Sequence, residues 1–164
     1  MVSGEGPKPC DGMIVGMNPG AEEVVQGRPF VGASGQLLEM ALGDLGHSRE
    51  EFYITNVYKD GTPDNREPTW EEVISHTDIL LDELEEVRPK AVLALGNVAT
   101  EFFLGERGIT RLRGNWGGMA LYPTMPTFHP SYILRTGGAG QGTYNMWVQD
   151  IAKWLDFVTR GAND

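Results

Sequence analysis

Two short apolar runs, each followed by a helical pattern, constrain the fold of this chain more than any other feature. The first covers Met13–Met17, and the second, "KAVLALG", ends at Gly96. The second run is almost continuously apolar, which is typical of a central strand in a parallel sheet that is covered on both faces. We therefore expect a buried parallel sheet with helices packed against it.

Further strands and helices are predicted between and after these runs. Phe52–Val57 is rich in β-branched and aromatic residues and predicts a strand, and a last strand is expected near Pro126–Phe128. Helices are expected from an N-cap at Ser34 to a stop at Gly46, from a capping box of Thr69 and Glu72 to about Val87, over Asn97–Leu104, and over residues 144–158. The segment 108–130 is expected to be irregular or to form a hairpin. The alternation predicts a three-layer α/β/α sandwich with a mostly parallel central sheet in one domain, residues 1–164.

Composition excludes several classes of protein. One cysteine, Cys10, excludes an intramolecular disulfide and a multi-cysteine metal site within the chain, and three scattered histidines give no metal-ligand pattern. No apolar run approaches the ~18 residues of a membrane span. The first residues lack the apolar stretch of a signal peptide, so we expect an intracellular protein.

The net charge of −10 argues against a nucleic-acid partner at first sight. The charges are unevenly distributed, however. Seven acids lie in the segment 69–87, whereas the arginines lie elsewhere, and a protein can combine an acidic back with a basic rim. DNA therefore stays among the expected partners.

Three loops follow the carboxyl ends of predicted strands, where α/β folds place their sites: Asn18–Gly32, Asn56–Arg66 and His129–Arg135. The first loop lacks the spacing of a dinucleotide-binding or P-loop motif, so a nucleotide-binding loop is not expected. Its glycines and prolines remove side chains, which lets backbone amides approach a flat ligand closely.

Four side chains in these loops are candidates, each with a structural alternative. Asn18 orients a water or caps a turn, and Phe30 stacks on a base or anchors the loop to the core. The amide of Asn56 matches the imide edge of a pyrimidine, or it ends the strand in a turn. His129, before Pro130, donates to a developing anion, acts as acid or base, or has a structural role.

Taken together and in order, these motifs resemble the uracil-DNA glycosylase superfamily, and most of all its iron–sulfur family 4. The resembling segments cover nearly the whole chain from Gly12 to Arg135: "GRPFVGASGQLL", "YITNVYK", "NREPTWEEV", "VRPKAVLALGNVAT", "ITRLRGNWGG" and "MPTFHPSYILR". The resemblance implies a monomer that hydrolyses the N-glycosidic bond of a flipped uracil or modified pyrimidine in DNA, without a metal or other cofactor.

The chain departs from family 4 in two places. Asp60 and His76 stand where two of the four cluster cysteines are expected, so the iron–sulfur cluster is predicted to be absent. Met17 stands where family 4 has an acidic residue. The motif "GMNPG" at Gly16–Gly20 looks instead like that of the single-strand-selective monofunctional and mismatch-specific branches, in which the Asn positions the attacking water.

The resemblance gives each matching residue an expected role. Asn18 and His129 are the catalytic candidates. The expected substrate-binding residues are Gly16, Met17, Pro19, Gly20, Phe30 and Asn56, and the expected DNA-binding residues are Arg28, Ser131, Tyr132 and Arg135.

Two questions stay open at this point. One is whether the chain is instead a binding module on a glycosylase fold that has lost its chemistry, as Met17, the missing cluster and the net charge favour. The other is whether the substrate is uracil or a 5-modified uracil. Glu22, Glu23 and Gln26 are the residues that could face the C5 position of the base.

Overall fold

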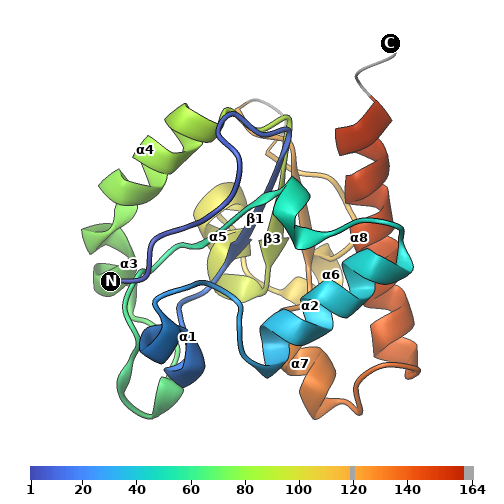
Figure 1. Ribbon diagram of the computed structural model, residues 1–164, viewed down its shortest axis with the longest axis horizontal. Helices are drawn as coiled ribbons and strands as arrows, with labels where there is room; N and C mark the ends of the chain where they lie inside the picture. The colour runs from blue at the N-terminus through green and yellow to red at the C-terminus, as the bar shows by residue number, and fades with distance from the viewer. Residues whose placement is uncertain (119–120, 161–164) are drawn as a thin grey trace.

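The computed structural model describes residues 1–118 and 121–160 (Figure 1). Its strands are β1 (Gly12–Gly16), β2 (Tyr53–Asn56), β3 (Ala91–Leu95) and β4 (Thr124–Thr127), and they form one sheet in the order β2-β1-β3-β4. Every pairing between these strands is parallel. The α/β class and the parallel central sheet are thus as predicted. Met119 and Ala120, in the segment expected to be irregular or a hairpin, and residues 161–164 of the predicted domain lie outside the described residues.

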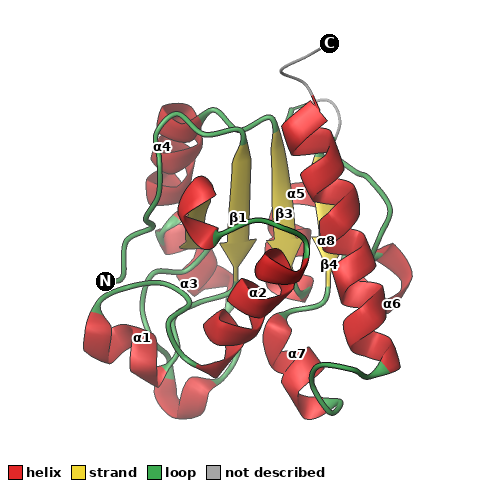
Figure 2. Ribbon diagram, turned by 45° about the vertical axis from the view of Figure 1, so that its right-hand side comes forward, coloured by secondary structure: helices red, strands yellow, loops and turns green. Residues whose placement is uncertain are grey.

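Helices cover both faces of the sheet, as the predicted three-layer arrangement requires (Figure 2). Met13 and Val15 of β1 pack with α4 (Thr77–Val87) and α5 (Asn97–Leu104) on one face. Ile14, between them, packs with α2 (Ala33–Asp44) and α8 (Gly142–Arg160) on the other face. The alternation follows from the two-residue period of a strand. Within the described residues, no helix has both the length and the apolar character that a membrane crossing needs.

The predicted start of α2 at Ser34 is wrong. The N-cap is Gly32, whose backbone N–H donates to the carboxylate of Glu23 at 2.6 Å, and Ser34 lies inside the first turn. The start of α2 is therefore held by the hydrogen bond from Gly32 to Glu23, and not by a side-chain hydroxyl at the N-cap. The predicted stop is found, since Gly46 has a left-handed φ of 83° just after the helix.

The helix predicted from Thr69 to about Val87 is two helices, α3 (Trp70–Ser75) and α4. The capping box is present: Glu72 N donates to Thr69 Oγ1 at 3.1 Å, and Thr69 N donates to Glu72 Oε1 at 2.8 Å. The break falls at His76, whose ring nitrogen Nδ1 accepts a hydrogen bond from Lys59 N. A tertiary contact thus overrides local helix propensity.

Three short helices lie in segments that were expected to be loops or irregular: α1 (Ala21–Gln26), α6 (Ile109–Leu112) and α7 (Pro130–Arg135). The start of α7 carries recognisable signals, because His129 is its N-cap and Pro130 its first helical residue. β4 begins before the predicted Pro126, and Gly117 forms an isolated antiparallel bridge with Thr124, which gives this segment part of the expected hairpin character.

Candidate active site

The carboxyl ends of the parallel strands meet at one edge of the sheet, and a cavity of about 270 Å³ opens there. Asn18 follows β1, Asn56 ends β2, and His129 follows β4. Seven of the predicted site residues line this cavity: Met17, Asn18, Gly20, Phe30, Asn56, His129 and Ser131. Residues far apart in the sequence are therefore brought to one place by the sheet topology.

Two side-chain amides lie in the cavity wall with their oxygens unpaired. Asn18 and Asn56 are 8% and 2% exposed, and within the described residues neither Oδ1 atom has a hydrogen-bond partner. The Nδ2 atom of Asn18 lies 3.4 Å from the backbone oxygens of Pro19 and Asp60. Buried polar atoms in native proteins are nearly always hydrogen-bonded, so two unpaired oxygens in one cavity indicate a place for a polar ligand or water.

A buried ion pair supports the end of β2. Lys59, 1% exposed, pairs with Glu83 and donates to Asn56 O and Thr55 Oγ1, both at 2.6 Å. Burial lowers the pKa of Lys59, and Glu83 opposes this shift. Glu83 also accepts from Tyr53 at 2.7 Å, so this acid of the segment 69–87 points into the interior and does not belong to an acidic outer face. The pair fixes the backbone from which the Asn56 amide projects.

Phe30 forms one wall of the cavity. Its ring centroid lies 5.9 Å from that of His129, and a Cβ atom at Gly16 would come within 2.4 Å of Phe30 Cζ and 2.7 Å of Asn56 Oδ1. Gly16 therefore leaves the space that these two side chains occupy. Pro19 is buried beside Asn18 and does not line the cavity.

His129 is held in a defined orientation by the start of α7. Its Nδ1 accepts the backbone N–H of Ser131 at 3.1 Å and lies 2.8 Å from Ser131 Oγ. Burial is the main cause that lowers the pKa of His129 to about 4; the charge of Arg135 adds to this shift, and Glu23 opposes it. The imidazole is therefore neutral at pH 7. Because Nδ1 accepts, the proton lies on Nε2, which makes this atom a hydrogen-bond donor.

A second cavity, also about 270 Å³, shares Met17, His129 and Ser131 with the first. Tyr132 and Arg135 line it, with the guanidinium of Arg135 5.9 Å from the centre of the Tyr132 ring. These two predicted DNA-binding residues thus lie beside the first cavity. Arg28 lies apart from both cavities.

Five arginines that lie outside the acidic segment 69–87 have carboxylate partners. The pairs are Arg28 with Glu5 at 2.8 Å, Arg66 with Glu72 at 2.7 Å, Arg107 with Glu67 at 2.8 Å, Arg111 with Glu106 at 3.3 Å, and Arg113 with Asp150 at 2.6 Å. A phosphate contact from any of them would have to replace or share an existing partner. Roles in DNA binding stay predictions for Arg28, Ser131, Tyr132 and Arg135.

Sequence reasoning missed the residues that hold the first loop. Glu23 accepts backbone N–H groups from Gly20 at 3.0 Å, Val31 at 2.9 Å and Gly32 at 2.6 Å. Glu23 lies three residues after the N-cap Gly20 and accepts its N–H, which is the acidic half of a capping box, and this spacing could have revealed α1. Arg49, 6% exposed, carries no motif signal. Of the residues considered for the C5 position, Glu22 and Glu23 line the cavity, whereas Gln26 donates to Glu22.

The two positions that match cluster cysteines lie together. His76 Nε2 is 3.7 Å from Asp60 Oδ2, Lys59 N donates to His76 Nδ1 at 2.9 Å, and the His76 ring stacks on Tyr58 with centroids 4.6 Å apart. In the described part of the chain, no group of three or more His, Cys, Asp or Glu side chains could hold a metal ion. Polar and aromatic contacts connect Tyr58, Lys59, Asp60 and His76, and we call this group of residues the Asp60–His76 corner.

Comparisons with known proteins agree with the geometry. Residues 3–153 match the family model "Uracil DNA glycosylase superfamily". The chain is 40% identical to a type-4 uracil-DNA glycosylase of Thermotoga maritima, over 98% of this chain and 84% of the relative. It is 38% identical to a type-4 enzyme of Archaeoglobus fulgidus, over 81% and 71%, and 37% identical to a type-5 enzyme of Pyrobaculum aerophilum, over 76% and 63%. The chain belongs to the uracil-DNA glycosylase superfamily.

Proposed function

We propose that the protein is a monofunctional DNA glycosylase that hydrolyses the N-glycosidic bond of uracil, or of a 5-modified uracil, flipped out of DNA. One observation carries the proposal: two buried amide oxygens without partners among the described residues, and a neutral imidazole, surround one cavity beside an aromatic ring. The family membership and the names of the type-4 relatives support the same chemistry.

The base is bound by its edge and its face. The Asn56 amide has a donor and an acceptor, and its unpaired Oδ1 accepts from the pyrimidine N3–H while Nδ2 donates to O4. Phe30 stacks on the ring, an interaction worth ~1–3 kcal/mol per base. Flipping costs a few kcal/mol, and less from a mismatch or a single strand.

The chemistry needs a placed water and a stabilised leaving group. Asn18 Oδ1 accepts a hydrogen bond from water and holds it against the sugar carbon C1′. The bond between C1′ and the base nitrogen breaks, the water oxygen bonds to C1′, and the water's proton passes to solvent. His129 donates from Nε2 to the departing base anion, as fixed donors do for developing charge. An amide is a poor base, so Asn18 acts by positioning, and a modest rate is expected.

The rival is a binding module that has lost its chemistry. Met17 and the paired arginines favour it, because the cavity has no acid at the family 4 position and, among the described residues, Arg28, Arg66 and Arg107 already pair with carboxylates. The variant Asn18→Ala separates the two. If Asn18 is catalytic, this variant loses base release and keeps DNA affinity, whereas the exposed-site control Asn115→Ala retains both. Equal base release by Asn18→Ala and the wild type would remove the assignment.

The substrate is determined with a panel of oligonucleotides. The panel carries uracil opposite guanine, opposite adenine and in a single strand, together with 5-hydroxymethyluracil and thymine, and alkali cleavage reveals the abasic sites. Release of any member supports the enzyme and names its substrate. No release across the panel, with measurable DNA binding, favours the binding module.

A further inference from the structure

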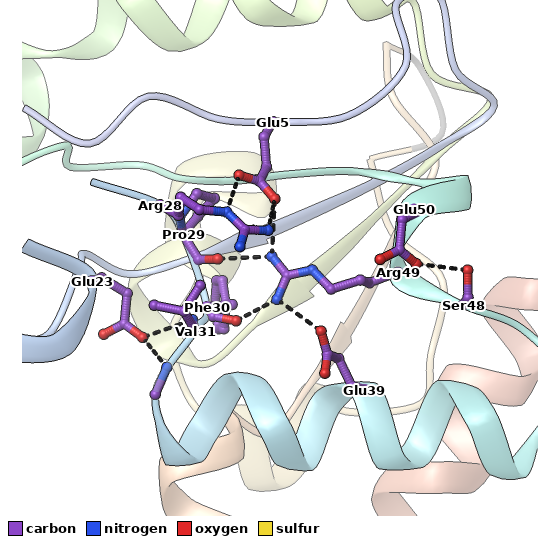
Figure 3. A network of polar contacts seen from close by, with 11 residues as sticks. Glu5, Glu23, Arg28, Pro29, Phe30, Val31, Glu39, Ser48, Arg49 and Glu50 are labelled. Atoms are coloured by element: carbon purple, nitrogen blue, oxygen red, sulfur yellow. Dashed lines mark hydrogen bonds and ion pairs between the residues drawn. The ribbon is translucent and has the colours of Figure 1, made fainter. Parts of the chain in front are cut away.

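The cavity wall that carries Phe30 is held from two sides by charged side chains (Figure 3). Arg49 donates from Nη2 to Pro29 O at 2.7 Å and from Nη1 to Phe30 O. Glu23 accepts the N–H groups of Val31 and Gly32 through one carboxylate oxygen. Each of the four consecutive residues 29–32 thus has one backbone N–H or C=O group hydrogen-bonded to Arg49 or Glu23. We call these two side chains the loop clamp.

The segment needs such support. Phe30 has a φ of 53°, in the left-handed region that a bulky side chain rarely adopts. Its carbonyl oxygen lies so close to α2 that a Cβ atom at Gly35 would come within 1.9 Å of it. The segment belongs to no strand or helix, so no ladder of backbone hydrogen bonds fixes it. Side chains must therefore supply the partners that regular structure would supply.

The chemistry of the two clamp residues suits this task. The guanidinium of Arg49 is planar and reaches the two carbonyl oxygens through two separate nitrogens held in a fixed fork, a geometry that the compact ammonium of a lysine does not match. Glu39 at 3.3 Å and Glu5 at 3.6 Å balance its buried charge. Both carboxylate oxygens of Glu23 accept hydrogen bonds from the backbone N–H groups that they face. A glutamine has only one acceptor oxygen, so its NH₂ group would face one set of these N–H donors.

We propose that Arg49 and Glu23 are positioning residues for the reaction, which act by fixing the Phe30 ring against the flipped base. The catalytic part of this inference rests on the proposed function. Arg49 does not line the base cavity, and the Glu23 carboxylate is bonded to three backbone N–H groups, so both act through the loop. Loss of either should misplace the ring without removing it.

A double-mutant cycle between Arg49→Lys and Phe30→Leu tests the coupling. We expect Arg49→Lys to lower kcat/KM for the released base by between about 10- and 100-fold, because small misplacements of a positioned group cost this much. In the Phe30→Leu background the same change should add little, since the ring it positions is gone. Losses that multiply in the double variant would overturn the proposal. Arg113→Lys is the matched control, because Arg113 also donates from two nitrogens of its guanidinium, in its case to the buried carboxylate of Asp150 and not to the loop that carries Phe30.

Amide hydrogen exchange gives a readout that does not depend on activity. Arg49→Lys and Glu23→Gln should each speed exchange at Val31 and Gly32, and Arg113→Lys should not. Unchanged exchange at both amides in both clamp variants would show that no clamp exists. If the wild type releases no base while exchange responds as expected, the proposed function fails and the clamp stands as a structural feature alone, without the catalytic role.

Discussion

The partly buried imidazole of His129 makes the stability of the protein depend on pH in a definite window. Its pKa is lowered from 6.5 to about 4 in the folded protein, chiefly by burial. Between these values the unfolded chain binds a proton at His129 and the folded protein does not. The free energy of unfolding therefore rises with pH through the window. The contribution is complete above pH 6.5 and is lost as the pH falls to about 4.

The magnitude follows from the two pKa values. A difference of about 2.5 corresponds to about 3 kcal/mol, since one pKa unit is worth about 1.36 kcal/mol. The carboxylates of Glu5 and Glu72 also have lowered pKa values, mainly through Arg28 and Arg66 respectively, and they too destabilise the protein as the pH falls. Their effect is the same in a variant at position 129, so only the difference between two proteins isolates the imidazole.

The comparison uses His129→Asn, because an asparagine oxygen can accept the Ser131 N–H as an N-cap. Urea unfolding of both proteins is measured from pH 7 down to pH 4. The wild type should lose about 3 kcal/mol more than the variant over this range. Proton NMR of the imidazole gives the pKa directly. The reasoning would be refuted if the free energies of unfolding of the two proteins fell in parallel with pH and the His129 resonance titrated near 6.5. The assignment of Nε2 as a neutral donor would then fail as well.

Two further substitutions probe the interior and the cavity. Lys59→Met should destabilise the protein by about 3–5 kcal/mol in urea unfolding, because Glu83 is left buried without its cation, and a loss below about 1 kcal/mol would mean that the pair is not ionised. Met17→Glu, made in the Asn18→Ala protein, should restore part of the lost base release, because a carboxylate in the same cavity can act as a general base worth about 10²–10⁴-fold. Persistent inactivity of that double variant would indicate that the side chain at position 17 does not reach the water.

The sheet and the place of the cavity could be predicted because they rest on short-range patterns. Apolar runs identify the central strands, and parallel strands necessarily bring their carboxyl ends to one edge. Asn18, Asn56 and His129 follow or end such strands, so their convergence needed no knowledge of side-chain packing.

The loop clamp and the inward turn of Glu83 could not be predicted in this way. Arg49 lies in a stretch of charged residues, and nothing local distinguishes a buried guanidinium from a solvated one. Glu83 sits among six other acids of the same segment, and only the approach of Lys59 from another part of the chain turns it inward. The break at His76 has the same origin, since its partner is a backbone N–H distant in sequence.

The Asp60–His76 corner differs from a four-cysteine cluster in how it responds to substitution. A cluster that needs four cysteines is kept or lost as a unit, because each ligand depends on the others. The ring stack, the backbone hydrogen bond and the ion pair at this corner are separate interactions, and each is individually weak. Loss of one of these contacts leaves the others in place, so the corner should tolerate single substitutions that a four-ligand cluster would not.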